Sequence, residues 1–196
     1  MYEINFDLAI ENALKLQKEI EEPVKIWDSP DKCDLDAKQT VLSMFYGMIE
    51  DKDIELINDK DNNNNPTALI DLIFDLYYYS SNTPIHHYVE IKQRSKPLGT
   101  YKDEMFEEHK LNILKSKVSK DSKVYIITIY PNNDFLVWNV ALLKDSDIRK
   151  GKSFQTYHTS YTLSENETPH YINKIYLDYN SDAVVYKGNF NNTYLS

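Results

Sequence analysis

A glutamate and a lysine stand two positions apart, as Glu90 and Lys92, inside an apolar run of β-forming residues. Because the side chains of a strand alternate between its two faces, both point to the same face. A second apolar run precedes them at hairpin distance and carries Asp71 and Asp75 on one face. Charged side chains on a half-buried sheet are costly unless they form ion pairs or bind a metal ion. The pattern therefore indicates either a carboxylate metal site beside a lysine or a cluster in which the lysine neutralises the acids.

The Glu-x-Lys spacing alone has little specificity. It occurs three times in the chain, at Glu50/Lys52, Glu90/Lys92 and Glu108/Lys110. Only the second pair lies in an apolar β-run, and only that pair follows a strand bearing aspartates. This context makes Glu90 and Lys92 the leading candidates for chemistry.

A β-hairpin is expected to position these residues. Residues 67–79 and 86–93 are rich in aromatic and β-branched residues, and the intervening Ser-Ser-Asn-Thr-Pro is a turn signal. If the turn centres between residues 81 and 82, Glu90 lies opposite Ile73. Asp71 and Asp75 then occupy the two diagonal positions, so either could approach Glu90.

The rest of the chain predicts an α/β fold with a mixed sheet. Apolar periodicity, caps and turn signals place helices at 7–20, from about 34 or 36 to 50, and at 101–116, and strands at 53–58, 123–130 and 135–143. A length of 196 residues suits one domain, here 1–196, with a core at about 36–143. Residues 150–196 are expected to extend the sheet or cap it.

Four segments together resemble the PD-(D/E)xK nuclease superfamily, a group of metal-dependent phosphodiesterases. They are Ile-Asp-Leu-Ile-Phe-Asp-Leu (70–76), Tyr-Val-Glu-Ile-Lys-Gln-Arg (88–94), Tyr-Lys-Asp-Glu-Met-Phe-Glu-Glu-His-Lys-Leu (101–111) and Val-Tyr-Ile-Ile-Thr-Ile-Tyr (124–130). The resemblance covers roughly residues 36–140, and small phage or bacterial nucleases are the members that look most similar. It implies a central sheet flanked by helices and hydrolysis of phosphodiester bonds.

The resemblance also implies roles for individual residues. Asp71 and Glu90 would bind Mg²⁺ or Mn²⁺, and Lys92 would be the catalytic lysine next to the attacking water. Asp71 is preferred over Asp75 because family members often carry Asp followed by three apolar residues, as in Asp71-Leu-Ile-Phe. The carbonyl of Ile91 is a further candidate ligand, since Mg²⁺ takes oxygen ligands.

Charge distribution is compatible with a nucleic-acid partner, although the overall net charge is −9. Residues 86–130 contain nine Lys or Arg and six Asp or Glu, a local net charge of +3, which leaves −12 on the rest of the chain. Phosphate binding requires such basic groups. The candidate nucleic-acid contacts are Gln93, Arg94, Lys96 and Lys110.

Composition restricts the cellular setting. A single cysteine, Cys33, permits no internal disulfide and favours a reducing, cytoplasmic compartment, which for a phage protein would be the host cell. No apolar run approaches the roughly 18 residues of a membrane span, so no membrane partner is expected. DNA is the expected substrate ahead of RNA, and a homodimer is compatible with the resemblance.

Two alternatives remain open from the sequence. Many superfamily members carry a glutamate on the helix before the sheet, and the candidates here, Asp36, Gln39 and Glu50, do not match it well. That departure favours a nuclease fold without catalytic activity that binds nucleic acid or serves a structural role. The −12 outside the basic segment instead favours an acidic protein-interaction module.

Overall fold

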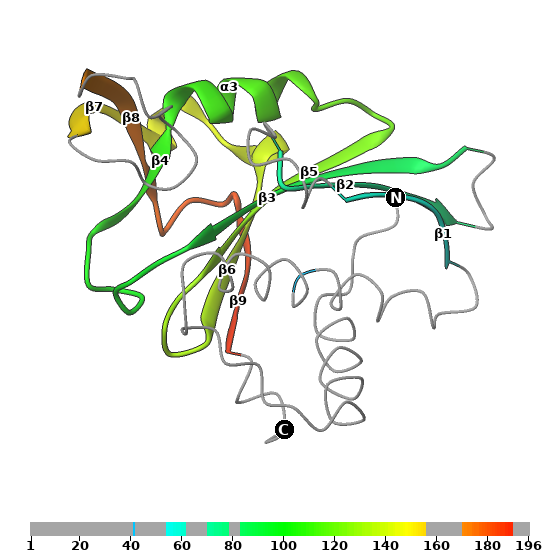
Figure 1. Ribbon diagram of the computed structural model, residues 1–196, viewed down its shortest axis with the longest axis horizontal. Coiled ribbons are helices and arrows are strands. Elements are labelled where there is room, and N and C mark those ends of the chain that lie inside the picture. Colours follow the sequence, from blue (N-terminus) through cyan, green and yellow to red (C-terminus); the bar gives the residue numbers. More distant parts are fainter. Residues whose placement is uncertain (1–40, 42–53, 62–69, 79–82, 156–169, 190–196) are drawn as a thin grey trace.

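The computed structural model describes residues 41, 54–61, 70–78, 83–155 and 170–189, which are the coloured parts of Figure 1. The expected helices at 7–20 and 34–50 lie outside these residues, apart from the buried, helical Val41. The described part is an α/β structure built on two sheets.

The main sheet is mixed and has six strands in the order β1-β2-β3-β5-β6-β9. Their bounds are Ile54–Asp61 (β1), Leu72–Tyr78 (β2), Ile85–Gln93 (β3), Ser122–Ile129 (β5), Asp134–Asn139 (β6) and Val184–Asn189 (β9). Every neighbouring pair is antiparallel except β3 and β5, which run parallel. The sequence predictions for β1, β3 and β5 are confirmed to within three residues at each end, and the strand expected over 67–79 is observed as β2 but begins only at Leu72.

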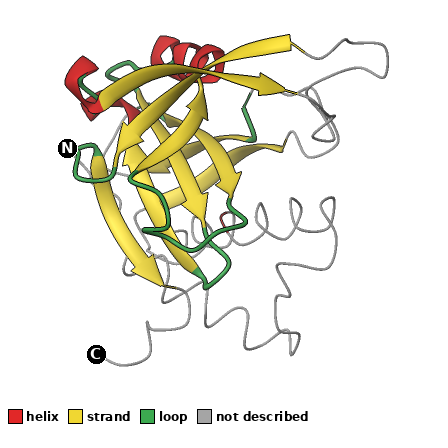
Figure 2. Ribbon diagram, turned by 90° about the vertical axis from the view of Figure 1, so that its left-hand side faces the viewer, coloured by secondary structure: helices red, strands yellow, loops and turns green. Residues whose placement is uncertain are grey.

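The parallel pairing of β3 and β5 needs a crossover connection. The intervening chain forms β4 (Asp103–Glu107) and, directly after it, α3 (Glu108–Ser116). β4 belongs to the second sheet, which has the order β4-β8-β7 and includes β7 (Ile148–Gln155) and β8 (His170–Asp178). Figures 1 and 2 show α3 lying along one side of the main sheet, beside this three-stranded sheet.

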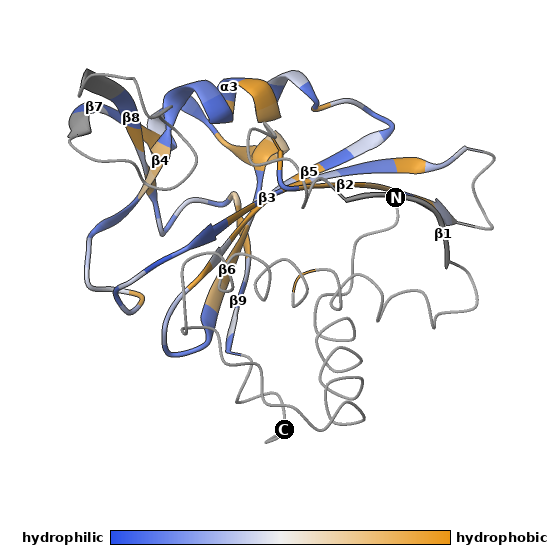
Figure 3. Cartoon of the chain, viewed as in Figure 1, coloured by the Kyte–Doolittle hydropathy of each residue, from blue (hydrophilic) through white to orange (hydrophobic). Residues whose placement is uncertain are grey.

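The core lies between α3, β4 and the centre of the main sheet. Leu111 and Leu114 of α3 and Phe106 of β4 are buried against Ile126 of β5 and Trp138 of β6. β5 is buried from residue 124 onward, as expected for a strand covered on both faces. Figure 3 shows hydrophobic residues gathering where β3, β5 and β6 cross.

The prediction of one helix over residues 101–116 is wrong in its first half. Residues 103–107 form β4, which pairs antiparallel with β8. Glu104 and Phe106 are buried while Met105 is exposed, a period of two that suits a strand. Pairing with a strand some seventy residues later in the chain overrides the local preference for helix.

Two further boundaries differ from prediction. The strand expected at 135–143 ends at Asn139, because Val140–Leu142 form a 3-10 turn (η1) whose Ala141 N–H donates to the Asn139 side chain. Within 150–196, β9 lies at the edge of the main sheet, and β7 and β8 belong to the second sheet.

Candidate active site

Glu90 is the most deeply buried charged residue of the candidate site. It lies on the central strand β3, and its side chain is 0% exposed. Lys92 Nζ lies 2.9 Å from Glu90 Oε1, and Lys110 Nζ donates to the same oxygen at 2.5 Å. Glu90 Oε2 has no hydrogen-bond partner among the described residues. One oxygen is therefore shared by two cations, and the other is buried with spare capacity to bind.

Lys92 is held as a permanent cation. Its Nζ lies 3.3 Å from Glu107 Oε2 and 5.3 Å from the centroid of the Phe106 ring. Burial, the largest single influence, favours the neutral amine, but the charges of Glu90 and Glu107 outweigh it and raise the pKa of Lys92 above its usual value. A lysine in this state can stabilise negative charge or orient a water molecule, but it is a poor general base.

Asp71 reaches the site from the residue before β2. Its Oδ2 accepts a hydrogen bond of 2.6 Å from the main-chain N–H of Ile91, next to Glu90. Burial and, after it, the negative charge of Glu90 raise the pKa of Asp71 to about 6. Two neighbouring carboxylates in a buried place repel each other, so an additional cation bound between them would be favoured.

The hairpin register decides between the two aspartates. Leu72 pairs with Val89 and Ile73 with Tyr88, so the expected placement of Glu90 opposite Ile73 is wrong by two residues. The observed register lets Phe74 stack on His87, with ring centroids 4.9 Å apart. Extending it by one position places Asp71 opposite Glu90.

Asp75 is placed elsewhere. It pairs with His86, and the His86 Nδ1–Asp75 Oδ1 distance is 2.7 Å. The reserve ligand Asp75 therefore does not lie beside Glu90, whereas the preferred aspartate, Asp71, does.

Glu107 and Lys174 complete the cluster and were missed by the sequence reasoning. Lys174 Nζ, from β8, lies 2.8 Å from Glu107 Oε1. Burial raises the pKa of Glu107, but Lys92 and Lys174 outweigh it and lower the pKa to about 2. Glu107 thus stays charged and holds Lys92. Its pattern suggested a solvated helix, and no local signal links it to Lys174.

The four expected nucleic-acid contacts have different surroundings. Lys110 reaches Glu90 and belongs to the cluster itself. Arg94 binds Glu104 and the main-chain carbonyl of Met105. Lys96 is exposed, and Gln93 is half-buried at the end of β3. Only Lys96 among the four is an exposed cation that forms no ion pair within the described residues.

The oxygen donors of the cluster suit a hard divalent cation. No group of three or more His, Cys, Asp or Glu that could hold a metal occurs within the described ranges. Mg²⁺, however, is commonly held by one or two carboxylates together with water and substrate phosphate. The buried Glu90 Oε2 and the nearby Asp71 carboxylate provide such a pair, and the Ile91 carbonyl is the third candidate ligand.

Comparisons with known proteins add no relative. No protein-family model matches the sequence, and no curated protein matches it. Among the described residues, no helix is long and apolar enough to cross a membrane.

Proposed function

We propose that this chain is a metal-dependent nuclease of the PD-(D/E)xK type that hydrolyses phosphodiester bonds, in DNA ahead of RNA. The observation that carries the proposal is the buried Glu90 with a free Oε2, two residues before a charged Lys92 and beside Asp71. The mixed sheet supports it further, because β1 to β3 are antiparallel and a crossover containing α3 leads to the parallel strand β5.

Each residue has a distinct part in the proposed reaction. Asp71 and Glu90, with the Ile91 carbonyl, would hold Mg²⁺ or Mn²⁺. The bound metal would lower the pKa of a coordinated water and neutralise charge on the phosphate. Lys92 orients the attacking water or stabilises the negative charge that develops on the phosphoryl oxygens.

Glu107 and Lys110 act on either side of these groups. Glu107 fixes Lys92 through its 3.3 Å ion pair and is itself fixed by Lys174. Lys110 shares Glu90 Oε1 with Lys92. When a cation takes up the Glu90 carboxylate, Lys110 becomes free to bind a phosphate of the substrate, as a partly exposed lysine on a flexible stem can do.

The decisive experiment is cleavage of supercoiled plasmid and of labelled single-stranded DNA with Mg²⁺, Mn²⁺ or EDTA. We expect metal-dependent cutting by the wild type and a loss of about 100-fold or more in Glu90→Gln and Lys92→Met, since each removes a group that acts on the reacting charge. Lys120→Ala is the matched control, because Lys120 is 90% exposed and, among the described residues, pairs only with its neighbour Asp121. Plasmid products would separate nicking from double-strand cutting.

One observation favours a second candidate function. Two lysines already neutralise Glu90, and a nuclease fold without activity could retain such a cluster as a purely structural ion network. This candidate predicts that wild type cuts no substrate under any of the metal conditions. It also predicts that calorimetry detects no Mg²⁺ or Mn²⁺ binding that Glu90→Gln abolishes.

A further inference from the structure

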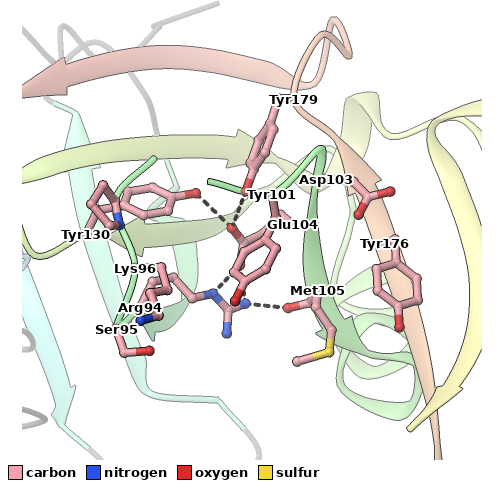
Figure 4. A pocket seen from close by; sticks show the side chains of 11 residues that line it. Arg94, Ser95, Lys96, Tyr101, Asp103, Glu104, Met105, Tyr130, Tyr176 and Tyr179 are labelled. Carbon is pink, nitrogen blue, oxygen red and sulfur yellow. Dashed lines mark hydrogen bonds and ion pairs between the residues drawn. The ribbon is translucent and has the colours of Figure 1, made fainter. Parts of the chain in front are cut away.

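A cavity opens beside the candidate active site, where β3 ends. It has a volume of about 410 Å³, within the usual range for small-ligand pockets. Its walls come from residues 94–97 after β3, from Tyr101 and β4, and from Tyr176 and Tyr179 of the β8 region. Figure 4 shows the tyrosine rings and the Arg94 guanidinium arranged around this space.

A buried carboxylate makes the inner wall rigid. Glu104 is 2% exposed and accepts hydrogen bonds from Tyr130 Oη at 2.7 Å and Tyr179 Oη at 3.2 Å. Arg94 binds the other oxygen of Glu104 and also the Met105 carbonyl (Figure 4). Because every polar group of this wall is held in place, the cavity is formed before any ligand binds.

The outer wall presents surface that the fold itself does not use. Tyr101 is 63% exposed and Met105 is 40% exposed, and both line the cavity. Lys96, also on its rim, takes no part in an ion pair among the described residues. The aromatic rings and the thioether match the face of a flat heterocycle, and the ammonium group of Lys96 at the rim matches a phosphate attached to that heterocycle.

The position along β3 relates the cavity to the proposed chemistry. Glu90, Lys92 and Arg94 are every second residue of one chain segment, so their side chains lie on the same face. Two residues of a strand span about 7 Å. The cavity thus begins one short step beyond Lys92, a step comparable with one extended nucleotide. A strand whose phosphate lies at Glu90 and Lys92 would bring a neighbouring base to Tyr101.

We propose that this cavity receives an unpaired nucleobase adjacent to the scissile phosphate, stacked on Tyr101, with Lys96 binding a flanking phosphate. The inference rests on the proposed nuclease function and sharpens it. Bases in a duplex are stacked on both sides and cannot enter a walled cavity unless they are flipped out. The substrate class is therefore single-stranded nucleic acid, or a duplex with an unpaired nucleotide at the cut.

Binding measured in EDTA tests this separately from catalysis. Fluorescence anisotropy would compare a labelled short oligothymidine, an abasic strand of the same length and a blunt duplex. We expect the wild type to prefer oligothymidine over both other probes. Tyr101→Ala should weaken oligothymidine binding about 5- to 100-fold, the effect of losing one base–aromatic stack, and leave abasic-strand binding unchanged.

Matched variants exclude trivial explanations. Tyr101→Phe keeps the ring and should bind like wild type, and Lys96→Ala should weaken oligothymidine and the abasic strand alike, whereas Lys120→Ala should weaken neither. Unchanged binding of oligothymidine by Tyr101→Ala, or equal affinity of wild type for oligothymidine and duplex, would overturn the proposal. If the binding pattern holds but no strand is cut with Mg²⁺ or Mn²⁺, the nuclease function fails while the base-binding cavity stands.

Discussion

Two buried glutamates, Glu90 and Glu104, lie in neighbouring parts of this protein and have different partners. Arg94 binds one oxygen of Glu104, and the hydroxyls of Tyr130 and Tyr179 bind the other. Glu90 has two lysines on one oxygen and, among the described residues, no hydrogen-bond partner on the second. A buried carboxylate whose acceptors are all used stabilises a fold. One with a spare buried oxygen is suited to take another cation.

The strand β4 connects the two arrangements. Glu104 and Phe106 point into the core, whereas Glu107 reaches Lys92 at the end of the same strand. The second sheet thus supports both sites, through Lys174 in one case and Tyr179 in the other. A pairing between distant segments therefore provides the rigid surroundings that each site needs.

The largest expected effect is a difference in the free energy of unfolding between variants of the two glutamates. Glu104→Gln leaves the partly exposed Arg94 without its counter-charge and puts an amide against the hydroxyls of Tyr130 and Tyr179, and it should lower the free energy of unfolding by about 3 kcal/mol. Glu90→Gln should cost less, about 1 kcal/mol, because Lys92 keeps Glu107, Lys110 keeps the nearby charge of Asp71, and the Gln carbonyl still accepts a hydrogen bond. Urea denaturation of both variants measures the difference. Equal losses would mean that Glu90, too, is a structural residue.

Acid titration should next reveal the support that Glu107 gives to Lys92. The pKa of Glu107 is lowered to about 2 in the fold from an ordinary 4.5. The ionised form is therefore favoured by folding, and its stabilisation is complete above about pH 4.5 and is lost as the pH falls toward 2. The shift corresponds to about 3 kcal/mol.

Comparison with Glu107→Gln isolates that contribution. The stability difference between wild type and this variant, measured by urea denaturation, should be largest near pH 6 and shrink steadily as the solution is acidified. A difference that is independent of pH would show that Glu107 is not held as a charged group.

Added metal should stabilise the protein through Glu90, by a somewhat smaller free energy. At a Mg²⁺ or Mn²⁺ concentration 100 times its Kd, binding to the native state adds about 2.7 kcal/mol to the free energy of unfolding. We expect a corresponding rise in the melting temperature of wild type and of Lys120→Ala, and none in Glu90→Gln. A rise in melting temperature that persists in Glu90→Gln would show that the metal binds somewhere other than this carboxylate.

Local sequence patterns predicted a substantial part of the candidate site. The strand expected over residues 86–93 places Glu90 and Lys92 on one face by its alternation alone, without any tertiary contact. The preference for Asp71 over Asp75, drawn from the resemblance, agrees with the observed register. Lys110, expected as a nucleic-acid contact, lies against Glu90, although part of its expected helix is a strand.

The sequence by itself therefore determined which apolar segments form the central sheet. It also determined that Glu90 and Lys92 share one face of a strand, because strand periodicity depends only on neighbours in the chain. The tertiary structure alone decided the hairpin register, the change of residues 103–107 from helix to strand, and the arrival of Glu107 and Lys174 beside Lys92. These depend on pairing and burial between segments far apart in sequence. The energy of such a contact cannot be predicted from either segment alone, since the contact forms only when both segments are in place.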